Sequence, residues 1–169
     1  VWDTRFTAAV IGLIHQGGMK SGSIESILSF VAKQSVDEAA ACAQALLSPE
    51  AVKDAALMER TIAVLSACLG DMPTATWHFA WPIVEADAAL AERVMLHAGG
   101  DFKYESSRLL VELTERQLAD FYLKVRSLFP PAGVSELPNG VVTARQSIGQ
   151  FRNNLISALE ARGTDVACS

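Results

Sequence analysis

The sequence predicts an all-α fold: an array of about eight or nine helices packed as antiparallel pairs, either a HEAT-like α-solenoid or an irregular helical array. Two observations predict this fold class. Half of the 169 residues are hydrophobic, alanine and leucine are in excess, and β-branched residues rarely alternate at a period of two. Apolar residues recur instead at helical spacing, between residue types that start and stop helices.

The charge balance limits the classes of partner. The net charge is −5 and the pI is near 5.2, with no run of three basic residues. We therefore expect no nucleic-acid and no membrane-surface partner. The longest apolar run, Thr61 to Gly70, is about half the length of a membrane span.

The cysteines predict a reducing compartment. Cys42, Cys68 and Cys168 are odd in number and far apart, and the sequence contains no C-x-x-C pair. Cys42 and Cys68 fall on apolar helical faces, where cysteine behaves as a small hydrophobic residue. We expect a cytoplasmic protein without a zinc site.

Three helices are expected in the first 47 residues. The first is capped by Asp3 or Thr4 and ends near His15, before Gly17-Gly18. The second is capped by Ser21 or Ser23 and ends near Gln34. A third follows a capping box formed by Ser35 and Glu38, and ends near Leu47.

Ser48-Pro49 is a strong helix start, with a cap residue followed by proline at the first helical position. One helix is expected from there to Gly70. Its apolar seam comprises Ala51, Ala55, Met58, Ile62, Leu65 and Leu69. We interpret this Ala51–Leu69 seam as core; the alternative is a contact through which two copies of the chain dimerise.

The middle of the chain predicts three further helices. Thr74 to Ala86 carries Trp77, Phe79 and Trp81, and Pro82 either kinks this helix or starts a new one. A helix after Asp87 is expected to stop at Gly99-Gly100. A short helix from about Tyr104 to Val111 follows.

The segment from Leu113 to Pro131 carries a complete set of helix signals. Thr114 and Gln117 have capping-box spacing, and Leu113 and Leu118 have the spacing of a hydrophobic staple. Pro130 and Pro131 end the helix. The apolar face comprises Leu118, Phe121, Tyr122, Val125 and Leu128.

A loop is expected from Pro130 to Val142, with a turn at Pro138-Asn139-Gly140. Thr143 and Gln146 then repeat the capping-box spacing, and the last helix ends at Gly163. T-E-R-Q at Thr114 and T-A-R-Q at Thr143 form a weak internal echo, of the kind that helical repeats show.

Catalytic chemistry is not predicted. His15, His78 and His97 each stand alone in a helix, and no phosphate-binding glycine motif or nucleophile motif is present. We expect no enzyme activity, no metal and no cofactor. An enzymatic alternative would need a polar pocket between helices near Trp77, Trp81 and His78.

Five residues are candidate contacts for a protein partner. Trp77 and Trp81, four apart on one helical face, are interpreted as core anchors, with a role as binding hot spots as the alternative. Ser135, Glu136 and Asn139 lie in the expected loop, and loops on rigid scaffolds often carry recognition.

The C-terminal third resembles a known family. The segments L-T-E-R-Q-L-A-D-F-Y-L-K-V-R-S-L-F-P-P and R-Q-S-I-G-Q-F-R-N-N-L-I-S-A-L-E-A-R-G-T resemble the helical-repeat regions of large bacterial STAND-type NTPases, NACHT-like proteins of which several are linked to antiphage defence. W-P-I-V-E-A-D-A-A-L-A-E-R-V, before them, looks like the preceding element of the same array. The resemblance covers roughly Trp77 to Cys168.

The resemblance implies a HEAT- or TPR-like array that recognises a partner or restrains an NTPase module. Residues 1–169 are then expected to form a single all-α repeat segment, a fragment of a larger protein, with the family-like part in 71–169 and a weaker likeness in 1–70. The expected function is a non-enzymatic protein-recognition or sensor segment, whose partner is a phage protein or the NTPase module of the same chain. The runner-up is a helical adaptor that homodimerises through the Ala51–Leu69 seam. The chain lacks a P-loop, so no catalytic position is carried over.

Overall fold

The computed structural model describes residues 4–16, 19–102, 107–130 and 139–163, and within these ranges every regular element is helical. The all-α prediction is confirmed, with eight helices of eleven residues or more in this part of the chain. The elements are α1 (Thr4–His15), α2 (Ser21–Gln34), α3 (Val36–Leu46), α4 (Pro49–Lys53), the 3₁₀ turn η1 (Ala55–Leu57), α5 (Met58–Asp71), α6 (Pro73–Ala86), α7 (Ala88–Phe102), α8 (Arg108–Glu112), α9 (Glu115–Leu128) and α10 (Asn139–Arg162).

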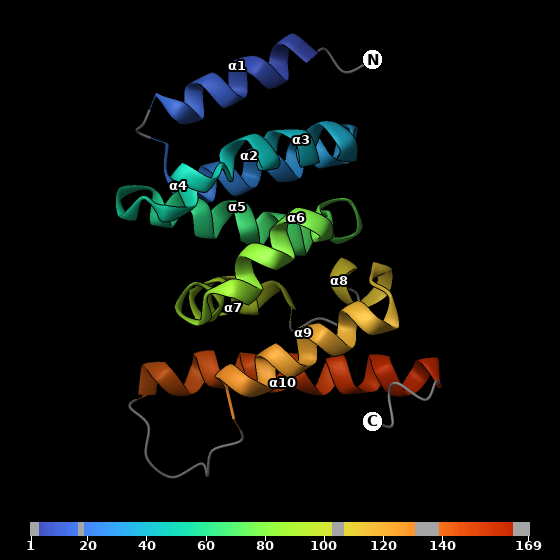
Figure 1. Ribbon diagram of the computed structural model, residues 1–169. Helices are drawn as coiled ribbons and strands as arrows, with labels where there is room; N and C mark the ends of the chain where they lie inside the picture. Colours follow the sequence, from blue (N-terminus) through green and yellow to red (C-terminus); the bar gives the residue numbers. More distant parts are fainter. Residues whose placement is uncertain (1–3, 17–18, 103–106, 131–138, 164–169) are drawn as a thin grey trace.

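The long helices form an array of two layers. Consecutive long helices alternate in direction: α1, α3, α6 and α9 run from right to left in Figure 1, and α2, α5, α7 and α10 run from left to right. Along the first layer α1 contacts α3 and α3 contacts α6, and along the second α2, α5, α7 and α10 contact one another in that order. This stacking of antiparallel pairs is the helical array that the sequence predicts.

Helix α5 lies at the centre of the array. It contacts α2, α3, α6, α7 and α8, and all nine residues from Thr61 to Leu69 are buried. A helix that is apolar on nearly every side is stable in water only when other elements surround it. The core therefore runs continuously through the stack rather than along one face of it.

The long seam predicted from Ala51 to Leu69 is wrong as a single helix. The chain leaves helical geometry at Asp54, whose Oδ1 accepts a hydrogen bond from the Ala56 amide (2.9 Å), and the 3₁₀ turn follows. Aspartate favours such local bonds over a helix interior. Ala55 is exposed, whereas Ile62, Leu65 and Leu69 are buried by neighbouring helices. A covered seam offers no surface to a second copy.

Several predicted helix starts are confirmed. Ser48 Oγ accepts a hydrogen bond from the Ala51 amide (3.2 Å), with Pro49 at the first helical position. Asp87 Oδ1 accepts from the amides of Ala89 and Leu90 at the start of α7. The capping box at Thr114 and Gln117 is complete. These side chains satisfy backbone donors that an isolated helix end leaves free.

The predicted caps of α2 and α3 need correction. Lys20, not Ser21 or Ser23, occupies the N-cap position of α2 and makes no side-chain cap. At α3, Ser35 Oγ accepts from the Glu38 amide (3.4 Å), but the Glu38 carboxylate accepts a hydrogen bond from the Thr7 hydroxyl of α1 instead of closing the capping box (3.2 Å). A contact between helices has therefore replaced the local one.

The predicted ends of α1 at His15, α2 at Gln34 and α6 at Ala86 are confirmed, whereas the predicted end at Gly99-Gly100 is wrong. Gly163 ends α10 with φ +63°, a conformation that glycine adopts without strain. Pro82, however, lies inside a continuous α6, and Gly99-Gly100 lie inside α7 rather than ending it. Helix α8 begins at Arg108 rather than near Tyr104. Helices can continue through weak positions when packing on both sides stabilises them.

The last helix starts earlier than the sequence predicts. Helix α10 begins at Asn139, so Asn139, Gly140 and Thr143 are all helical and the predicted capping box at Thr143 is wrong. The echo between Thr114 and Thr143 is therefore not a repeat of structure: the first threonine is an N-cap and the second lies inside a helix.

Candidate interaction surface

Helix α6 is fixed to α5 at its first turn. Pro73 stands at the first helical position, and the Thr76 hydroxyl is within hydrogen-bond distance of the carbonyl oxygens of Cys68 (3.0 Å) and Met72 (2.9 Å). Thr76 is fully buried. A buried hydroxyl of α6 that finds acceptors in α5 and in the residue joining the two helices holds their junction in one geometry.

The inner side of α6 carries an aromatic cluster. The rings of Trp77 and Trp81 are stacked, with centroids 4.7 Å apart and planes 11° apart, and Trp81 also packs on Phe121 of α9 (5.2 Å). Phe121 meets Phe151 of α10 edge to face (5.5 Å). The cluster links three helices by the offset and edge-on contacts that aromatic rings prefer. Figure 1 shows α6 crossing the stack above α9 and α10.

The opposite side of α6 is apolar and partly open to solvent, while its residues Ala75, Phe79 and Ile83 also pack against the core. Its residues follow the spacing of one helical face, and none of them carries a carboxylate, lysine or arginine. His78 and Pro82 are exposed, whereas Phe79 and Ile83 are half-buried. The α6 outer face, as we call it, consists of Ala75, His78, Phe79, Pro82, Ile83 and Ala86.

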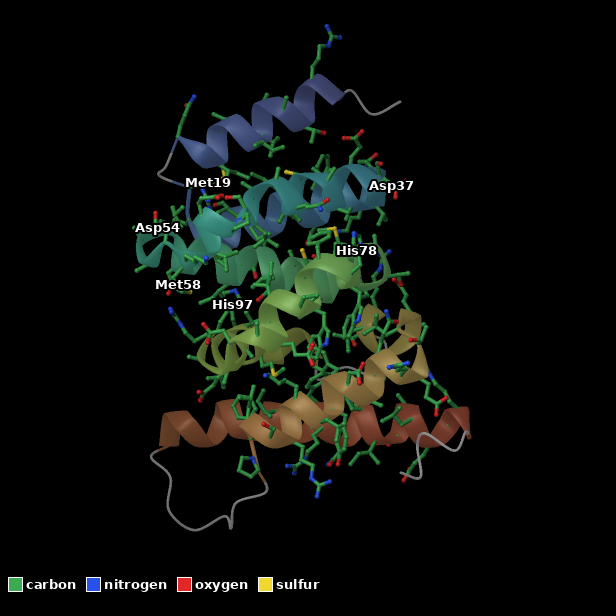
Figure 2. All side chains as sticks on the ribbon, viewed as in Figure 1. Met19, Asp37, Asp54, Met58, His78 and His97 are labelled. Atoms are coloured by element: carbon green, nitrogen blue, oxygen red, sulfur yellow. The ribbon has the colours of Figure 1, made fainter. Side chains whose placement is uncertain are left out.

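Pro82 changes the hydrogen bonding of this face. Proline has no amide hydrogen, so the carbonyl oxygen of His78, one turn earlier, lacks its usual intrahelical donor. The His78 ring lies edge-on to Phe79, with centroids 5.1 Å apart, and Figure 2 shows His78 on the right-hand part of α6. An aromatic ring, a proline ring and a backbone acceptor therefore lie together on an exposed helix.

The five predicted partner contacts differ in where they lie. Trp81 is 5% exposed, so it is a core anchor and cannot be a contact residue in this conformation. Trp77 is half-buried against the core. Asn139 is the first residue of α10 rather than a loop residue, while Ser135 and Glu136 lie outside the described residues.

The thiols are buried and protonated. Cys42 and Cys68 are free cysteines at 1% and 0% exposure. Burial raises the pKa of the Cys42 thiol from 9.0 to about 11, with a smaller contribution from the Glu38 charge. Burial likewise raises the pKa of the Cys68 thiol to about 12, and a hydrogen bond with Thr76 opposes this shift. Neither thiol has the exposed, acidic character of a nucleophile.

The described residues bring together no group of three or more histidine, cysteine, aspartate or glutamate side chains that could hold a metal ion. In the same ranges no helix has both the length and the apolarity to cross a membrane. The Nε2 atom of His97 lies within hydrogen-bond distance of Glu25 Oε1 of α2 (2.8 Å), and the His15 side chain is outside the described part. The enzymatic alternative had paired His78 with the two tryptophans, but His78 is exposed on the outer side of α6 while Trp81 is buried on the inner side.

Sequence reasoning missed the α6 outer face because it considered only the two tryptophans of this helix. The signal was present: the segment from Pro73 to Val84 contains no aspartate, glutamate, lysine or arginine. A surface helix that presents a face without charged side chains leaves apolar side chains in water, and such patches mark interaction sites.

Comparison with known proteins adds no relative: no family model, no curated protein and no solved structure matches this chain.

Proposed function

We propose that this chain is a non-enzymatic protein-recognition segment, and that the α6 outer face is its contact surface. The observation that carries the proposal is a helical face without carboxylate, lysine or arginine, with an exposed histidine and proline and half-buried phenylalanine and isoleucine. Interface cores are depleted in charge and enriched in aromatic residues, as this face is. Helical arrays supply such surfaces without moving their own core.

The likeness to the helical-repeat regions of STAND-type NTPases supplies the biological setting of the proposal. In that setting the segment senses a partner for a larger bacterial signalling NTPase in the cytoplasm, and the partner is a phage protein or the NTPase module itself. This step rests on the quoted sequence segments alone. The adaptor alternative is weaker, because the buried residues of α5 cannot meet a second copy.

The test is affinity capture with matched surface variants. The chain is used as bait in lysates of phage-infected and uninfected bacteria, and captured proteins are identified by mass spectrometry. Pro82→Glu places a charge in the α6 outer face and also removes a helix-breaking residue, so folding should be preserved. Leu123→Glu is the control, because Leu123 is a 59% exposed apolar residue on α9.

The proposal predicts a protein that is captured by the unmodified chain and by the Leu123→Glu variant but lost with Pro82→Glu. Enrichment only after infection would identify a phage-dependent partner. Capture that is unaffected by Pro82→Glu would reject the α6 outer face. If the bait recovers only itself, with a dimeric mass by light scattering, protein recognition as proposed is wrong and the adaptor alternative takes its place.

A further inference from the structure

Helix α5 is more completely buried than its place in the array explains. It is flanked by α2 and α7 in its own layer and backed by α3 and α6 in the other layer, and the short helices α4 and α8 also contact it. A helix in this position has a fourth side that faces solvent in a flat layer. Yet Ala63, Ser66 and Ala67 are 0%, 5% and 4% exposed. Side chains from neighbouring helices must cover this side.

The covered side of α5 is a stripe of small residues, Ala63, Ser66, Ala67 and Gly70, at helical spacing. Leu65 lies on the opposite side of the helix, whereas Ile62 and Leu69, each one turn from Ser66, border the stripe. Cys68 is also on that opposite side, and it interacts with Thr76 of α6. The small stripe therefore faces away from α6, towards the open side of the layer.

Two side chains meet across this stripe. The Nε2 atom of His97, from α7, lies 2.8 Å from Oε1 of Glu25, from α2. A carboxylate only accepts hydrogen bonds, so Nε2 is the donor. These two helices are separated in the layer by α5, and Figure 2 places His97 where α7 meets α5.

Two other contacts fix where the pair lies along α5. Helices α2, α5 and α7 run in the same direction. Ser29 of α2 bonds to Asp71 near the end of α5, and Arg93 of α7 bonds to Glu59 near its start. Glu25 is one turn before Ser29, and His97 is one turn after Arg93. Both residues therefore approach the middle of α5, over its small stripe.

We propose that the Glu25–His97 pair is a latch that holds α2 and α7 closed over the small-residue face of α5. Both side chains are about one-third exposed, at 30% and 34%, so water can compete for them. The closed state leaves the Ser66 hydroxyl buried without a hydrogen-bond partner, and this favours opening. When the latch opens, water reaches Ser66 and the groove between α2 and α7 becomes accessible. The latch is independent of the α6 outer face and of any partner bound there.

The test measures access to the small stripe with an introduced thiol. Ser66→Cys is made in the full chain, and its alkylation by iodoacetamide is followed by peptide-resolved mass spectrometry, so that the natural cysteines do not interfere. The rate is compared in the presence and absence of Glu25→Ala or His97→Ala. Arg93→Ala is the matched control, because it removes an ion pair of α7 that reaches only the adjacent α5.

The latch predicts that Glu25→Ala and His97→Ala each speed alkylation roughly two- to fivefold, the range expected for an exposed ion pair. Arg93→Ala should leave the rate unchanged, and the reversed pair Glu25→Lys with His97→Glu should restore protection. Equal rates in all variants, or equal acceleration by Arg93→Ala, would overturn the proposal. If Ser66→Cys does not fold, Ala67→Cys reports on the same stripe with the same expected order of rates.

Discussion

Arg162, in the last turn of α10, donates a hydrogen bond from Nη2 to the carbonyl oxygen of Leu110 in α8 (2.9 Å), and its Nη1 donates to Leu113. The last carbonyls of a helix have no intrahelical donor and carry partial negative charge. Other cations repeat this relationship at helix ends. They are Arg108 to Asp71 (2.6 Å), Lys124 to Glu85 (2.7 Å) and Arg152 to Phe129 (3.4 Å).

Arg162→Ala should destabilise the array. The change removes two charged donors from the end of α8, and each hydrogen bond to a charged group contributes about 1.5–3 kcal/mol when partly buried. Because Arg162 is half-buried, we expect a loss of about 1–3 kcal/mol in the free energy of unfolding, measured by urea denaturation. Arg116→Ala, at an exposed position of α9, should stay within about 0.5 kcal/mol. Equal losses in both variants would show that the capping geometry contributes nothing.

The two T-x-R-Q segments should respond differently to the same substitution. Thr114→Ala removes an N-cap that accepts from the Gln117 amide (3.3 Å), and it should cost about 0.5–2 kcal/mol. Thr143→Ala changes a residue inside α10, where alanine has the higher helix propensity, so stability should hold or rise slightly. Thermal unfolding followed by circular dichroism measures both. A larger loss at Thr143 would mean that α10 begins there after all.

The two tryptophans should differ in their contribution to stability. Trp81→Ala removes a ring that is buried against both Trp77 and Phe121, and it should cost about 3–5 kcal/mol. Trp77→Ala removes a half-buried ring whose centroid lies farther from that of Phe121 (6.4 Å). The loss in the free energy of unfolding should therefore be smaller than for Trp81→Ala. Urea unfolding of the two variants decides the order. A binding defect without a stability loss in Trp81→Ala would contradict its assignment to the core.

Stability should fall at alkaline pH because of the buried thiols. In the unfolded chain a thiol loses its proton near pH 9.0, whereas in the folded chain Cys42 and Cys68 hold theirs until about pH 11 and 12. Above pH 9 the unfolded state therefore binds fewer protons, and each cysteine lowers the free energy of unfolding by about 1.4 kcal/mol per pH unit up to its folded pKa. Below pH 9 neither cysteine makes the free energy of unfolding depend on pH.

The measurement is chemical denaturation between pH 8 and 11 under reducing conditions. Tyrosine and lysine also titrate in this range, so the informative quantity is the difference between the unmodified chain and the Cys42→Ala and Cys68→Ala variants. Each variant should show a shallower decline with pH. Parallel curves would mean that the thiols are already accessible in the folded state.

Local signals in the sequence determined the fold class, most helix starts and the composition of the core. A cap such as Ser48 or Thr114 acts within a single turn, because its partner amide is three residues away and no distant residue is needed. The apolar face of α9 was likewise predictable, since Leu118, Phe121 and Val125 are all buried. These features depend only on helical geometry and on the exclusion of apolar side chains from water.

Tertiary structure decided where weak or competing local signals were overruled. Pro82 and Gly99-Gly100 are helix breakers in isolation, but α6 and α7 continue through them because each packs on several other helices. At Asp54 the reverse occurred, and a side-chain hydrogen bond broke a helix that the apolar seam favoured. The Glu38 carboxylate accepts a hydrogen bond from the hydroxyl of Thr7, 31 residues away, instead of closing a local capping box.

The candidate sites show the same division. The absence of charged residues from Pro73 to Val84 was visible in the sequence, but only packing decided that Trp81 turns inward while His78 and Pro82 face solvent. Glu25 and His97 are 72 residues apart, and no spacing rule connects them. They meet because α2 and α7 flank the same helix, whose small residues leave room for two side chains to join above it. The sequence by itself specifies the interactions within one helical turn, whereas contacts between helices form only once the helices have packed.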